Sequence, residues 1–109
     1  MQIVKSVYLL TEELPLDEKY GLKSQIQRCA VSVPSNIAEG SGRGTVKDFI
    51  YFLNVSLSSS YELEIQLILL NDLYGIKANE LIDNINEVQR MIIGFKRSLN
   101  AEQPVNNTE

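Results

Sequence analysis

The residues of this 109-residue sequence that could do chemistry are few, and their spacing does not suit catalysis. Glu62 and Glu64 look like an acid and base pair, but residues two positions apart point about 200° apart on a helix and cannot share one substrate. The sequence has no histidine, the commonest general base and metal ligand. Cys29 is the single cysteine, and we expect it to be a small buried apolar residue rather than a nucleophile. The sequence therefore predicts no catalytic residue, no metal site and no cofactor, so we expect a protein that is not an enzyme.

The glycine-rich run GSGRGT, residues 40–45, superficially resembles a phosphate-binding loop. It has neither a preceding strand nor the Gly-Lys-Ser/Thr ending that holds phosphate in such loops. The run is also compatible with a turn between two helices, where glycine tolerates a positive φ and Arg43 can reach a carboxylate or a helix end. We favour the turn.

A stripe of polar residues runs beside the apolar face of the predicted second helix. Its members are Arg28, Ser32, Ser35, Asn36 and Glu39. Two interpretations stay open: a solvated face, or a partly buried hydrogen-bond network that sets packing or register. The residues that we assign to such a structural network are Arg28, Ser35, Asn36, Glu39, Arg43 and Glu64.

Glu64 carries a specific expectation, because it lies within an apolar arc of the predicted third helix. A charge there needs an opposite charge or a route to water. Arg28 and Glu39 are separated by eleven positions, roughly 16 Å along a helix, so they cannot pair with each other. We predict that an arginine holds Glu64, with Arg28 the first choice and Arg43 the second.

Four amphipathic segments must position these residues. The first ends at Pro15, and its apolar face is formed by Ile3, Val7, Leu10 and Leu14. The second runs from about residue 17 to residue 40, and its apolar face is formed by Leu22, Ile26, Cys29, Val33 and Ile37. Pro34 lies inside this second pattern and predicts a bend rather than a break.

The third segment has clear predicted boundaries, and the fourth has a regular spacing of apolar residues. Thr45, with Asp48 three positions on, is predicted to cap the third helix, and Gly75 to end it after Tyr74. This helix would be on the order of 45 Å long. The fourth segment alternates spacings of four and three between its apolar residues, which are Leu81, Ile85, Val88, Ile92, Phe95 and Leu99.

These segments predict an all-α fold, an antiparallel up-and-down four-helix bundle with a kinked second helix and a long third helix. We expect one domain over residues 1–100 and a flexible C-terminal tail over residues 101–109, AEQPVNNTE, which is too polar to offset the entropy of ordering. The sequence shows no signal-peptide pattern and no apolar run of roughly eighteen residues, so we expect a cytoplasmic protein without membrane association.

The predicted third helix is apolar around well over half of its circumference, which is more than one bundle core can cover. The excess predicts self-association, because an exposed apolar patch of that size usually marks an interface. The interface candidates are Ile50, Leu57, Tyr61, Ile65 and Ile68. Ser56 and Ser60 would permit close helix approach. A narrow polar strip, expected to face solvent or a central channel, consists of Lys47, Asn54, Ser58, Glu62 and Gln66.

One long stretch carries a family resemblance. The sequence YGLKSQIQRCAVSVPSNIAEGSGRGTVKDFIYFL, residues 20–53, resembles the signature of the four-helix-bundle proteins first noticed as reading frames inside 23S ribosomal RNA intervening sequences. The similarity continues through SYELEIQL at residues 60–67 and RMIIGFKRSL at residues 90–99. The resemblance implies a four-helix bundle that commonly assembles into pentameric rings. It extends to accessory proteins of diversity-generating retroelements, which are basic where this chain is acidic.

Two functions compete on this basis. The first is a non-enzymatic homo-oligomer, with five copies as the leading form, that presents a surface to a protein or nucleoprotein partner. The alternative is a nucleic-acid-binding accessory protein for RNA or DNA, suggested by the resemblance and by scattered basic residues, namely Lys19, Lys23, Lys77, Lys96 and Arg97. The formal net charge of −4 counts against a broad phosphate-binding face.

Overall fold

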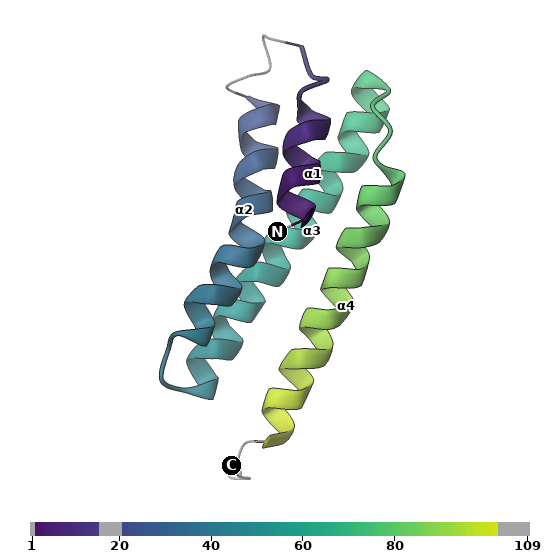
Figure 1. Cartoon of the computed structure of the whole chain (residues 1–109). Coiled ribbons are helices and arrows are strands. Elements are labelled where there is room, and N and C mark those ends of the chain that lie inside the picture. Colours follow the sequence, from purple (N-terminus) through teal and green to yellow (C-terminus); the bar gives the residue numbers. More distant parts are fainter. Residues whose placement is uncertain (1, 16–20, 103–109) are drawn as a thin grey trace.

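The computed structural model describes residues 2–15 and 21–102, and this part of the chain is all-α with no strand. Its four helices are α1 (Gln2–Thr11), α2 (Leu22–Ser41), α3 (Val46–Tyr74) and α4 (Asn79–Glu102) (Figure 1). The predicted all-α four-helix bundle with a long third helix is confirmed. The tail expected over residues 101–109 begins within α4, and residues 103–109 lie outside the described part.

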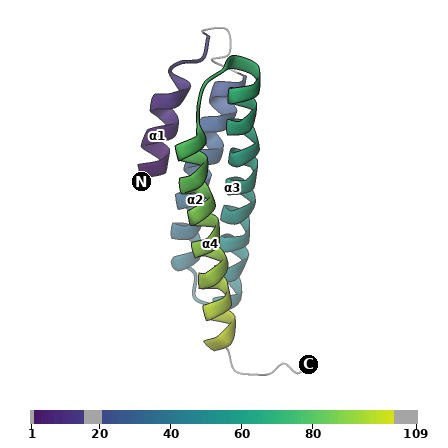
Figure 2. The same ribbon diagram turned by 90° about the vertical axis from the view of Figure 1, so that its right-hand side faces the viewer.

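The helices pack in a cycle, in which α2 contacts α1 and α3, and α4 contacts α3 and α1 (Figures 1 and 2). Pairs of residues show that α2 and α3 run in opposite directions, since Ser56 donates to the carbonyl of Val33 whereas Gly40 lies against Phe49. The described bundle measures 53 × 23 × 22 Å. None of its helices combines the length and apolarity needed to cross a membrane, among the residues described.

The ends of α3 follow the capping rules. The side chain of Thr45 accepts a hydrogen bond from the backbone N–H of Asp48 at 3.1 Å, as predicted. At the other end Gly75 has φ 68°. Its N–H donates to the carbonyl of Asn71 at 2.9 Å, and the N–H of Ile76 donates to the carbonyl of Leu70 at 3.3 Å. Both predicted boundaries of α3 are therefore confirmed.

The second helix starts later than predicted, at Leu22, and residues 16–20 lie outside the described part. It continues through Pro34 as one helix, and a bend at that position stays a prediction. Gly40 is buried for a reason that the sequence pattern did not show. A Cβ at this position would lie 2.8 Å from the Cβ of Phe52 and 2.9 Å from Cδ1 of Phe49. Gly40 thus lets the end of α2 approach the start of α3.

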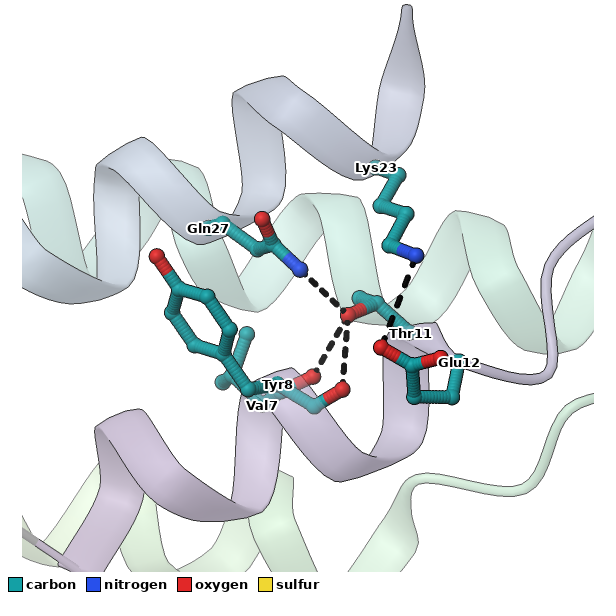
Figure 3. A network of polar contacts seen from close by, with 6 residues as sticks. All are labelled: Val7, Tyr8, Thr11, Glu12, Lys23 and Gln27. Atoms are coloured by element: carbon teal, nitrogen blue, oxygen red, sulfur yellow. Dashed lines mark hydrogen bonds and ion pairs between the residues drawn. The ribbon is translucent and has the colours of Figure 1, made fainter. Parts of the chain in front are cut away.

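The first helix is much shorter than the others and lies beside only part of α2 and α4 (Figures 1 and 2). Val7 is completely buried, and Ile3 and Leu14 join it in the core. Thr11, also completely buried, donates its hydroxyl to the carbonyl of Val7 at 2.9 Å and accepts from Nε2 of Gln27 at 3.1 Å (Figure 3). The Thr11 hydroxyl therefore links α1 to α2 through its hydrogen bond with Gln27.

Candidate functional site

An apolar surface is exposed on the second half of α3. Its members, which we call the α3 strip, are Tyr61, Ile65, Ile68 and Leu69, and their exposed fractions are 46%, 58%, 39% and 39%. Their spacing of four, three and one places them on one side of the helix. The opposite side is buried by Leu63, Leu67 and Leu70, each with no exposed surface. The second half of α3 therefore has apolar residues both toward the bundle core and toward solvent.

The structure divides the five predicted interface residues into two groups. Tyr61, Ile65 and Ile68 are exposed, whereas Ile50 and Leu57 are half-buried against their own chain. The serines expected to permit close helix approach do so inside the chain. Ser56 is fully buried and donates to the carbonyl of Val33 on α2 at 2.7 Å, and Ser60 is 1% exposed.

The polar strip predicted on α3 is wrong at one position. Gln66 is only 6% exposed, and its Oε1 has no hydrogen-bond partner within the described structure. Its side chain lies beside the thiol of Cys29 on α2, which is half-buried. Burial, followed by the negative charge of Glu62, raises the pKa of Cys29 above the usual value for a thiol. Cys29 is thus a neutral, packed thiol with one polar side.

The predicted polar network is not continuous: the structure shows three separate groups of polar contacts. In the first, on the faces of α2 and α3 that meet, the hydroxyls of Ser32 and Ser59 lie 2.8 Å apart, and Nδ2 of Asn36 donates to Oγ of Ser32 at 2.9 Å. Arg28 is outside this group, since its guanidinium donates to Oγ of Ser24 on its own helix. Ser35 is exposed.

The second group lies at the turn between α2 and α3. The guanidinium of Arg43 donates to Oε2 of Glu39 at 2.6 Å and lies 4.8 Å from the ring centre of Phe52. The preference for a turn over a phosphate loop agrees with this geometry. None of the glycines described in the turn has a positive φ, which only Gly75 has in the described chain. The turn therefore depends on close packing at Gly40 rather than on left-handed backbone.

The third group joins α3 to α4 and corrects the prediction for Glu64. Oε1 of Glu64 accepts a hydrogen bond from Nε2 of Gln89 at 3.0 Å, and Oε1 of Gln89 accepts one from Asn86 at 3.0 Å. The prediction that Arg28 or Arg43 holds Glu64 is wrong, because each arginine has a partner close to itself in sequence. The uncharged amide of Gln89 therefore donates to the half-buried carboxylate, and Asn86 holds that amide in turn.

Sequence reasoning missed Gln89, although a signal was present. Gln89 follows Ile85 by four positions and precedes Ile92 by three, so it occupies a core-facing position of α4. A polar residue at such a position needs a hydrogen-bonding partner. Glu64, the charge within the apolar arc of α3, is that partner. Glu62, two positions earlier, lies beside Cys29, so the two carboxylates face different neighbouring helices.

The fold defines a class of protein, the small all-α four-helix bundle with an unusually long third helix. The model of one family, 23S rRNA-intervening sequence protein, matches residues 1–94. The chain therefore belongs to that family, as the resemblance at residues 20–53 and 60–67 indicated. A search among curated proteins found no match to this chain.

Proposed function

We propose that this chain is a non-enzymatic, self-associating helical bundle that acts as a structural or interaction module in the cytoplasm, with a ring of five copies as the leading form. The observation that carries the proposal is the exposure of the α3 strip. Four large apolar side chains on one side of a helix form a patch of the kind that protein interfaces cover. The number five comes from the family resemblance.

The chain has few ways other than association to remove the α3 strip from water. A single exposed leucine is ordinary on a protein surface, but a group of four adjacent apolar residues is not. The strip lies on a well-packed helix whose opposite face is buried in the core, so the chain cannot hide it by a small rearrangement. A second copy covers it without cost to the fold.

Light scattering coupled to size exclusion tests the proposal at micromolar concentration. We expect a mass several times the 12.3 kDa of one chain. Ile65→Asp should reduce the mass toward that of one chain, because it places a charge within the strip. The control is Leu9→Asp, since Leu9 is 65% exposed on α1, away from the strip, and should leave the mass unchanged. A wild-type mass near that of one chain contradicts self-association, and a dimer or tetramer contradicts only the ring of five.

Binding of nucleic acid is a second candidate, favoured by how charge is distributed along the bundle. Residues 36–60 and 90–102, at the end that holds the α2–α3 turn, carry five basic and three acidic residues. The other described residues carry four basic and eight acidic residues. One end is therefore locally basic within an acidic chain, which is the electrostatic requirement for a phosphate contact. Of the basic residues expected to contribute, Lys96 and Arg97 belong to the basic end, Lys23 and Lys77 belong to the acidic remainder, and Lys19 lies outside the described part.

Electrophoretic mobility shifts with duplex DNA and structured RNA test this candidate. Binding through phosphates should retard the nucleic acid at low salt and weaken steeply as salt rises. The double variant Lys47→Glu and Lys96→Glu should abolish the shift, while Lys5→Glu and Lys77→Glu, an equal change of charge elsewhere, should retain most of it. Absence of any shift at low salt rules the candidate out.

A further inference from the structure

Gly94 lies in the interior of α4, where the chain itself gives no reason for a glycine. Glycine inside a helix destabilises it relative to alanine. Gly40 is explained by the phenylalanines against it, but at Gly94 no atom lies within 4 Å of the place where a Cβ would be. The residue is exposed and its φ is not positive. A glycine with open space in front of it suits the close approach of another helix from outside.

The neighbours of Gly94 resemble an uncovered interface. Met91 is 65% exposed and Phe95 is 43% exposed, although Phe95 continues the apolar rhythm of α4. Phe95 is half-covered by an edge contact with Phe49, at 5.3 Å between ring centres. Arg90 and Arg97 are exposed on the same outer side and make no ion pair with any described residue. We call these five residues the α4 patch: Arg90, Met91, Gly94, Phe95 and Arg97.

We infer that the α4 patch is the surface that receives the α3 strip of a second copy, so that each copy offers both halves of one contact. This inference rests on the self-association proposed above and specifies its geometry. The strip supplies large apolar side chains, and the patch supplies a place where a helix can approach closely. Without this contact, both surfaces leave apolar side chains in water.

Charge favours this pairing over the pairing of two α4 patches. Glu62 and Asp72, both exposed, flank the α3 strip, whereas Arg90 and Arg97 flank Gly94. Contact between unlike surfaces brings acidic residues of one copy near basic residues of the next. Contact between two α4 patches across a two-fold axis would bring arginines near arginines, which repel.

The two surfaces overlap in height along the bundle at one edge. The bond between Glu64 and Gln89 shows that Ile65 of α3 and Arg90 of α4 are at the same level of the bundle. From that level the α4 patch extends toward the α2–α3 turn, since Phe95 contacts Phe49, so the second copy is shifted along the bundle axis relative to the first. Because α3 and α4 are neighbours in the bundle, their outer faces point in different directions, and a contact between such unlike faces forms a ring when its rotation closes.

Substitution of Gly94 tests the close approach. Gly94→Ala adds one methyl group into open space, so it should leave the monomer fold at least as stable while weakening association by about tenfold. Gly94→Leu should abolish association. Folding is measured as the melting temperature in the monomeric Ile65→Asp background. A lower melting temperature for Gly94→Ala there, or an unchanged association constant for both variants, overturns the inference.

Crosslinking decides which surfaces meet. In a Cys29→Ser background, Ile65→Cys and Met91→Cys chains of different tag length are mixed and oxidised. The inference predicts disulfides between the two kinds of chain and few within either kind. An oligomer that links Ile65→Cys to itself, links Met91→Cys to itself, or gives no link overturns the inference while self-association stands. A monomeric wild type overturns the proposed function, and the inference with it.

Discussion

Nε2 of Gln89 on α4 donates a hydrogen bond of 3.0 Å to Oε1 of Glu64 on α3. Gln89 is 7% exposed and Glu64 is half-buried, so this bond joins two polar groups inside an otherwise apolar contact between helices. Each group satisfies the other only at one axial position of α4 relative to α3. The pair therefore specifies the register of the two longest helices, an arrangement that apolar contacts alone leave less well defined.

The first prediction concerns this pair. Gln89→Leu should destabilise the protein by about 1–2 kcal/mol, because it leaves the carboxylate of Glu64 and the amide of Asn86 without their partner. Glu64→Gln should cost less, since it keeps an acceptor for Gln89. Urea unfolding gives both values, and Asn84→Leu, on the exposed side of α4, is the control. Equal stability of Gln89→Leu and the wild type would show that water replaces the bond.

A second prediction concerns the attachment of α1. Thr11→Val should cost about 1–2 kcal/mol, because it keeps the volume of the buried side chain but removes the acceptor used by Nε2 of Gln27. Glu12→Gln should cost little, since its ion pair with Lys23 spans 3.6 Å and the Glu12 side chain is 69% exposed. Thermal unfolding of both variants provides the comparison. A larger loss for Glu12→Gln than for Thr11→Val would reverse this ranking.

The third prediction compares substitutions at two glycines that should destabilise the protein for different reasons. Gly40→Ala should destabilise by about 1–3 kcal/mol, because the new methyl group meets Phe52 and Phe49 at less than 3 Å. Gly75→Ala should cost about 1 kcal/mol for a different reason, a left-handed backbone with φ 68° and no steric neighbour. Adding Phe49→Ala, which removes the ring carbon Cδ1 that the new methyl group meets, should recover part of the loss at Gly40 and none at Gly75. Double-mutant unfolding experiments measure this recovery.

The fourth prediction uses the thiol. Burial and the negative charge of Glu62 both disfavour the thiolate, so they raise the pKa of Cys29 and slow its alkylation. Glu62→Gln removes the charge, which should lower that pKa and speed alkylation by iodoacetamide at mildly alkaline pH. Asp72→Asn, an equal change of charge farther along α3, is the control. A thiol that reacts at the same rate in all three proteins would mean that burial alone governs its pKa.

Local chemistry made several features predictable. The Thr45 cap, the Gly75 end of α3 and the amphipathic rhythm of α4 each depend on residues within a few positions of one another, and the structure confirms them. The excess apolar surface of α3 was predictable too, because helical periodicity alone shows how much of a circumference is apolar. Tyr61, Ile65 and Ile68 are exposed as that reasoning implied.

Partners across helices were a different problem. The sequence by itself determined that Glu64, a charge within the apolar arc of α3, needed a partner, but that partner lies on another helix. Only the tertiary structure decided that Gln89 rather than an arginine holds Glu64, and that Gly40 is crowded while Gly94 is open. The physical reason is that helix propensity and capping act over a few residues. Hydrogen bonds and steric contacts between helices depend instead on register and rotation, which the packing of the whole bundle determines.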